Sequence, residues 1–166
     1  ALRQSALATA RRLLSLGLKR GDRVAVVAET GPEFMGVFFA CQYAGLIPVA
    51  LPATINLGGH QSFVAQLRGL IENSSAAVAI ASEAFMPFVA EATDGLELRM
   101  IGEPAEFDAL AESAEALPRI EPDDISYLQY TSGSTRFPRG VIITHRSVMS
   151  NLSGIIAHGV KIGEGD

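Results

Sequence analysis

A cluster of small hydroxylic residues around one glycine lies in the last quarter of the sequence and could bind an anion. The cluster is Thr131-Ser132-Gly133-Ser134-Thr135, and it is followed closely by Arg136, Arg139 and Gly140. Hydroxyls can donate hydrogen bonds, and successive backbone N–H groups in such a turn can converge on one anion. The glycine permits a close backbone approach, and a guanidinium can bind phosphate oxygens with two parallel hydrogen bonds. The pattern predicts that these eight residues form a nucleotide-phosphate-binding loop.

This loop differs from two common phosphate-binding motifs. Gly133 and Gly140 are separated by six residues and no Lys follows, so the pattern G-x-x-x-x-G-K-[ST] is absent. No G-x-G-x-x-G occurs, so a dinucleotide site has no support. A Ser/Thr-rich surface turn before a hairpin strand is the alternative explanation. The longer string YTSGSTxxPxGV, with a predicted strand on each side, favours the phosphate loop over such a turn.

The elements expected to position the loop alternate along the chain. Continuous apolar runs such as RVAVVA indicate strands covered on both faces, as in a parallel sheet. Apolar residues at helical spacing indicate helices between them. Strands are expected over residues 23–28, 47–51, 76–81, 96–101, 125–130 and 141–144, and helices over 2–16, 32–45, 61–73, 83–92, 107–117 and from 145 onward. This order predicts a three-layer α/β fold with a mainly parallel sheet and helices on both faces.

Two segments carry a resemblance to a known family. The run YTSGSTRFPRGV, residues 130–141, followed by Thr144-His145, resembles the phosphate-loop motif of the adenylate-forming superfamily. That superfamily includes acyl-CoA synthetases, luciferases and peptide-synthetase adenylation domains. Residues 21–52 resemble its first strand–helix–strand unit, so the resemblance spans nearly the whole chain.

Departures from the usual motif point to one subgroup. Arg136 replaces the usual Gly, and Arg139 replaces the usual Lys of the loop. Together with Gln129 ahead of the loop, and with the segment NLGGHQSFVAQLRGLIENSSAAVAI, this form is similar to fatty-acyl-AMP ligases. Such enzymes make an acyl-adenylate from a fatty acid and ATP, and typically pass the acyl group to an acyl carrier protein.

The resemblance implies a reaction and a set of partners. Thr131, Ser132, Gly133, Ser134 and Thr135 would wrap the β- and γ-phosphates of ATP, Arg139 would replace the loop lysine, and Mg²⁺ would bridge the phosphates. A fatty acid would be activated to acyl-AMP with release of pyrophosphate. Coenzyme A is the alternative acyl acceptor, and a nucleotide-binding α/β module without catalysis is an alternative from another class.

The chain is expected to be one part of a longer enzyme. It begins without a start methionine, inside a predicted helix. In the resembled family the adenine-binding segment, the ribose-binding aspartate, the acyl tunnel and the catalytic lysine all lie downstream of the loop. We therefore expect residues 1–166 to be a partial N-terminal AMP-binding domain that contains no catalytic residue and is inactive alone.

The amino-acid composition indicates a globular domain and disfavours several other classes of protein. The hydrophobic fraction of 48% and the charged fraction of 19% are typical of a globular domain. The net charge of −5 disfavours non-specific binding to nucleic acid or anionic membranes. No apolar run is long enough to cross a bilayer. The single Cys41 lies in an apolar run, which favours a buried thiol over a nucleophile and is compatible with a cytoplasmic location.

Three histidines are further candidates for chemistry. His145 follows Thr144 at a predicted strand-to-helix junction, where a helix-capping role for the pair is favoured. His60 lies in a Gly-rich loop and His158 in a late helix. Neither has partners at metal-ligand spacing, so we expect solvated side chains and no metal site.

The acidic residues favour structural roles. Asp22, Asp123 and Asp124 are predicted in turns, where their side chains can bond nearby backbone. A catalytic carboxylate pair formed by Asp123 and Asp124 is disfavoured, because adjacent side chains tend to point apart. Glu112 and Glu115 are expected on the charged face of a helix.

Overall fold

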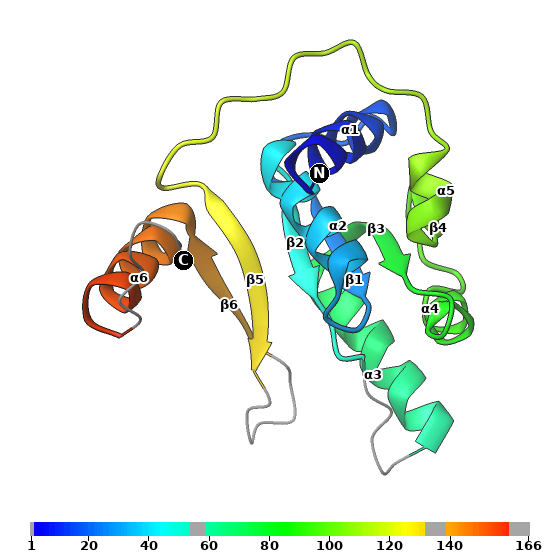
Figure 1. The fold of residues 1–166 in the computed structure, drawn as a ribbon. Coiled ribbons are helices and arrows are strands. Elements are labelled where there is room, and N and C mark those ends of the chain that lie inside the picture. The colour runs from blue at the N-terminus through cyan, green and yellow to red at the C-terminus, as the bar shows by residue number, and fades with distance from the viewer. Residues whose placement is uncertain (1, 54–58, 132–138, 160–166) are drawn as a thin grey trace.

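The computed structural model describes residues 2–53, 59–131 and 139–159. Within them, strands and helices alternate along most of the chain (Figure 1). The elements are α1 Leu2–Ser15, β1 Arg23–Val27, α2 Pro32–Tyr43, β2 Ile47–Ala50, α3 Gly59–Ser74, β3 Ala76–Ala81, α4 Met86–Ala92, β4 Met100–Gly102, α5 Pro104–Asp108, β5 Ile125–Thr131, β6 Arg139–Thr144 and α6 His145–His158.

The strands form one six-stranded sheet in the order β4-β3-β1-β2-β5-β6. Every neighbouring pair is parallel except β5 and β6, which are antiparallel. The prediction of a mainly parallel sheet is therefore confirmed. The carboxyl ends of β1, β2, β3 and β5 share one edge of the sheet, and the chain reverses direction there between β5 and β6.

Helices cover both faces of the sheet, as predicted. Alternate residues of β1 point to opposite faces, as the strand period of two requires. Ala25 and Val27 pack in a core with α3 and α4, whereas Val24 and Val26 pack in a second core with α1, α2 and α5. All four side chains are almost completely buried, so β1 is the centre of the three layers.

The helix predicted over residues 107–117 is wrong. The helix α5 begins at Pro104, inside a capping box formed by Glu103 and Glu106, and ends at Asp108. The chain must then pass from β4 at one edge of the sheet to β5, which lies beyond β3, β1 and β2. An extended chain covers about twice the distance per residue that a helix covers. Figure 1 shows this connector as a long arch, and Glu112 and Glu115 lie on it rather than on a helix.

Two other elements begin three or more residues later than predicted. The strand predicted at 96–101 pairs only over Met100–Gly102, because a turn at Gly95 delays pairing until the Arg99 N–H bonds the Ala77 carbonyl. The helix α4 begins at Met86 instead of residue 83, since a turn in which the Phe85 N–H bonds the Ser82 carbonyl precedes it. Neither change moves an element to another face of the sheet.

Candidate nucleotide-phosphate site

The predicted phosphate loop connects β5 to β6, and its two described ends, Thr131 and Arg139, lie at the carboxyl ends of the parallel strands. Thr131 is the last residue of β5 and pairs with Arg139, the first residue of β6. Ligands of open α/β sheets bind outside the carboxyl ends of the strands. The other predicted loop residues, Ser132, Gly133, Ser134, Thr135 and Arg136, lie outside the described residues.

Tyr130 lies close to Gly140, at a position where an added side chain would be crowded. The two residues face each other across the hairpin. A Cβ on Gly140 would lie 3.3 Å from the Tyr130 ring atom Cζ and 3.4 Å from Cε1. The backbone of Gly140 has no positive φ, so side-chain crowding and not handedness explains the glycine. The prediction that Gly140 binds phosphate remains a prediction, whereas its packing role was missed.

Tyr130 is also bonded to a distant helix. Its hydroxyl donates a hydrogen bond of 2.6 Å to Oδ1 of Asn73, near the end of α3. The ring packs against the core beneath α3 and α4, and this burial raises the pKa of the Tyr130 hydroxyl. The hydroxyl therefore remains a protonated donor at neutral pH. Sequence reasoning did not identify Asn73, because no local pattern connects residues 57 positions apart.

Arg139 presents a cation beside the loop. Its side chain is exposed at the start of β6. No carboxylate in the described part of the chain forms an ion pair with it. A guanidinium without a carboxylate partner is available for a phosphate, so the arrangement fits an anionic ligand.

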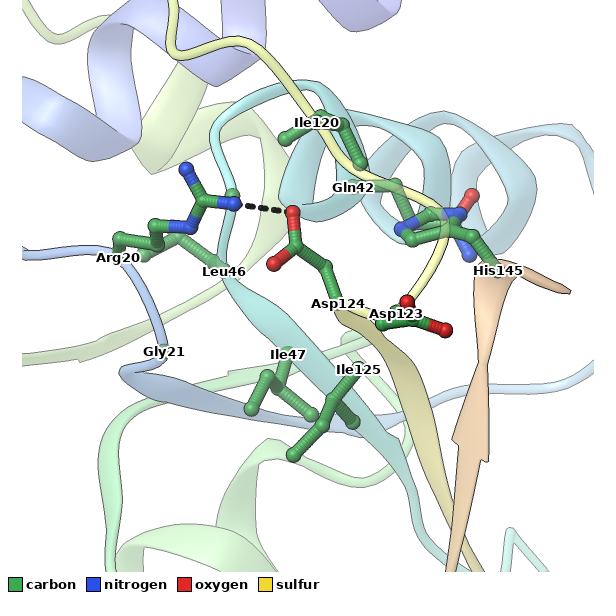
Figure 2. Close-up of a pocket in the computed structure, with 11 residues that line it drawn as sticks. Arg20, Gly21, Gln42, Leu46, Ile47, Ile120, Asp123, Asp124, Ile125 and His145 are labelled. Atoms are coloured by element: carbon green, nitrogen blue, oxygen red, sulfur yellow. Dashed lines mark hydrogen bonds and ion pairs between the residues drawn. The ribbon is translucent and has the colours of Figure 1, made fainter.

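A second group of polar residues lines a hollow of about 220 Å³ at the amino ends of the parallel strands, opposite their carboxyl ends. Figure 2 shows the Arg20 side chain directed at Asp124, with which it forms an ion pair. Arg20 also donates to the Arg119 carbonyl, and Asp124 accepts a hydrogen bond of 2.7 Å from the Glu121 N–H. The hydrogen bond from Arg20 lowers the pKa of Asp124. The turn role predicted for Asp124 is confirmed.

Asp123 has a different partner. Both of its carboxylate oxygens accept hydrogen bonds from Arg146, at 2.8 and 3.0 Å, and this pairing lowers the pKa of Asp123. The side chains of Asp123 and Asp124 therefore bind different arginines. These separate partners agree with the expectation that adjacent side chains point apart, although the ion pair of Asp123 was not predicted.

Buried contacts beside this hollow connect the hairpin to the rest of the sheet. Nε2 of Gln42 donates to the Ser126 hydroxyl at 2.6 Å, and Ser126 is completely buried. The residues Gly21, Ile47 and Ile125 place the hollow at the amino ends of β1, β2 and β5. These amino ends are opposite Thr131 and Arg139, so we interpret the contacts as structural links that hold β5 in register.

The cap predicted for Thr144 is confirmed. Thr144 is the N-cap of α6, and its hydroxyl accepts a hydrogen bond of 3.2 Å from the Ser147 N–H. His145 follows as the first helical residue, and burial lowers its pKa. Its ring lines the hollow, so it contributes to packing beside Asp124.

Replacing Thr144 by alanine is expected to lower the free energy of unfolding by about 1 kcal/mol, because an N–H at the start of α6 loses its partner. Urea unfolding followed by circular dichroism measures the change. Thr144→Ser keeps the hydroxyl and should retain most of the stability. Equal losses in the two variants would show that the methyl group of Thr144, and not the cap, is responsible.

The remaining candidates have structural partners or face solvent. His60 is half exposed, as expected, and also bonds Glu91, but it lies in the first turn of α3 and not in the predicted loop. His158 is exposed near the end of α6, as expected. Asp22 accepts a hydrogen bond from the Lys19 N–H, which confirms its turn role.

Cys41 is completely buried in the core, and burial raises the pKa of its thiol. It is therefore an inert packing residue, as predicted. Among the described residues, no three His, Cys, Asp or Glu side chains are grouped so that they could hold a metal ion. None of the described helices is both long and apolar enough to span a membrane.

Comparison with known proteins agrees with this architecture. A chain from a structural and functional study of fatty acyl-adenylate ligases from E. coli and L. pneumophila is 51% identical and superposes with a TM-score of 0.91, over 99% of this chain and 30% of that one. McyG A-PCP, in a complex with phenylalanyl-adenylate, is 26% identical, with a TM-score of 0.81 over 94% of this chain and 25% of that one.

Curated relatives give the same family. A putative acyl-CoA synthetase of Caulobacter vibrioides is 39% identical over 99% of this chain and 28% of its own length. A putative fatty-acid–CoA ligase of Mycobacterium tuberculosis is 30% identical over 83% of this chain and 24% of its own. This chain thus spans less than a third of the length of these relatives. The family model described as AMP-binding enzyme matches residues 1–166, and the chain belongs to that family of adenylate-forming, acyl-activating enzymes.

Proposed function

We propose that the whole protein activates a fatty acid with ATP, forming acyl-AMP and releasing pyrophosphate, and then passes the acyl group to an acyl carrier protein. The observation that carries this proposal is the β5–β6 hairpin, which ends at the carboxyl edge of the sheet and presents Arg139 beside the loop. The 51% identity to a chain from work on fatty acyl-adenylate ligases supports the choice of acyl substrate.

In this proposal the hairpin holds the phosphates of ATP. Hydroxyl and backbone donors come from Thr131, Ser132, Gly133, Ser134 and Thr135. Gly140 allows the backbone of β6 to lie close to the phosphates. Positive charge comes from Arg136 and Arg139. A carboxylate oxygen of the fatty acid then attacks the α-phosphorus in line as the bond to pyrophosphate breaks. Holding the reactants in line and neutralising the phosphates would provide most of the rate enhancement. Mg²⁺ bridging the phosphates would neutralise further charge.

This proposal and its alternative differ in the molecule that accepts the acyl group. The relative from Caulobacter vibrioides, described as a putative acyl-CoA synthetase, supports coenzyme A as the acceptor. The full-length enzyme should be incubated with ATP, Mg²⁺ and a radiolabelled fatty acid, together with either coenzyme A or a phosphopantetheinylated carrier protein. We expect the radiolabelled acyl group to be transferred to the carrier protein. Efficient transfer to coenzyme A alone would establish the alternative.

We also propose that the chain is the first part of the large domain of a longer, cytoplasmic enzyme. The helix α6 has no buried residue, and large apolar side chains are exposed along one of its faces and on β6. On β6 these side chains are the adjacent Val141 and Ile142. On α6 they are Met149, Leu152, Ile155 and Ile156, which we call the α6 apolar face. More than two thirds of each relative's length would be available to cover this face.

The 166-residue chain alone is expected to show no fatty-acid-dependent exchange of labelled pyrophosphate into ATP, because it supplies only the phosphate loop. The matched control is the full-length enzyme at the same concentration, in which we expect exchange. Robust exchange by the short chain would refute the proposal that catalysis needs the remainder. ATP binding without exchange by the full-length enzyme would instead favour a non-catalytic nucleotide-binding module.

A further inference from the structure

We propose that Asn73 is a positioning residue for the phosphate site, because it holds Tyr130 where the ring determines the position of Gly140 and Arg139. The inference rests on the proposed function, since Arg139 is the cation assigned there to the phosphates. Asn73 lies in α3, outside the predicted loop, and acts through its hydrogen bond with Tyr130.

The first step is the bond between α3 and β5. The Tyr130 hydroxyl and Oδ1 of Asn73 are 2.6 Å apart, although the residues are 57 positions apart in sequence. Tyr130 has two rotatable side-chain bonds, and a partner at the far end of the ring restricts both. The rest of the ring packs against the core that includes Phe63 and Leu67, so the ring is held along its length.

The second step is the contact between Tyr130 and β6. The ring lies close to Gly140, where an added Cβ would lie 3.3 to 3.5 Å from Cζ, Cε1 and the hydroxyl oxygen of Tyr130. Gly140 pairs with Tyr130, and the adjacent Arg139 pairs with Thr131. A ring that shifts toward β6 would therefore press on the backbone of Gly140 and displace the adjacent Arg139.

The third step is the kind of residue required at position 73. The Tyr130 hydroxyl is the donor in this bond, so position 73 must supply an acceptor oxygen to form it. Asn73→Asp preserves such an oxygen at the same distance from the backbone, whereas Asn73→Ala removes it. Tyr130→Phe removes the donor and leaves the ring in place.

The full-length enzyme tests the inference by steady-state pyrophosphate exchange. In Asn73→Ala and in Tyr130→Phe we expect the KM for ATP to rise about fivefold, the typical effect of one lost hydrogen bond, with the KM for the fatty acid unchanged. The double variant should be no worse than either single variant, because both remove the same bond. Asn73→Asp should remain close to the wild type.

A matched control separates positioning from helix stability. Glu72→Ala removes the ion pair between Glu72 and Arg68 on the same turn of α3, and should leave the KM for ATP unchanged. Multiplying effects in the double variant, or a fall in melting temperature with no change in the KM for ATP, would overturn the inference.

A readout independent of activity distinguishes failure of the inference from failure of the proposed function. In the absence of ATP, Asn73→Ala should accelerate amide hydrogen exchange at Arg139, Gly140 and Val141 and leave the amides of α4 unchanged. Acceleration in an enzyme that shows no pyrophosphate exchange would support the positioning and refute the function. Unchanged amide exchange at these residues would refute the positioning, even in an active enzyme.

Discussion

Replacing Arg139 by alanine in the full-length enzyme is expected to raise the KM for ATP about 10- to 100-fold, the range for losing a hydrogen bond to a charged group. The reason is the position of Arg139. It begins β6 directly opposite Thr131, is exposed, and has no ion pair with a carboxylate in the described part of the chain. Its charge is therefore not already neutralised by a neighbour, and the alanine variant should lose a phosphate contact.

The KM for the fatty acid distinguishes this role from a structural one. A residue that contacts only the phosphates should change this KM by less than about twofold. Arg139→Lys keeps the charge but loses the two-bond geometry of the guanidinium, so we expect an intermediate KM for ATP. Equal increases in both KM values for Arg139→Ala would indicate that Arg139 stabilises the hairpin instead of binding ATP.

Much of the fold could be predicted because the strands are buried on both faces. The run RVAVVA and its counterparts at 47–51 and 76–81 are almost entirely apolar, which is the signature of parallel strands between two helical layers. The connector at 109–124 could not be predicted in the same way. Leu110 and Leu117 have a spacing that fits a helix, but the distance that the chain must cross depends on the strand order.

The same distinction between local and distant features applies to the candidate site. The hydroxyl-rich run and the two arginines are local in sequence, and their types alone suggest anion binding. The contacts that support the hairpin are not local. Tyr130 bonds Asn73, Gln42 bonds Ser126 and Arg20 pairs with Asp124, across separations of 57, 84 and 104 residues. Such pairs depend on strand order, and no local pattern identifies them.

The α6 apolar face gives the second large prediction, which compares the effect of one substitution in the 166-residue chain and in the full-length enzyme. Leu152 is 44% exposed and shares a helix face with Met149 and Ile156. In the 166-residue chain, Leu152→Asp should change the free energy of unfolding by less than about 0.5 kcal/mol, as expected for a surface substitution. In the full-length enzyme the same substitution should cost about 3 kcal/mol or more, because it would bury an unpaired carboxylate.

Urea unfolding of both chain lengths measures the two changes, and Ser150→Asp is the matched control. Ser150 is exposed on the other side of α6, so its replacement should have a small effect in either length. The difference between the two positions matters more than either value, because both variants add the same charge to the same helix. If Leu152→Asp is as mild as Ser150→Asp in the full-length enzyme, the remainder of the polypeptide does not cover this face. The apolar side chains of α6 would then require another partner, and the proposal that this chain is the first part of a larger packed domain would fail.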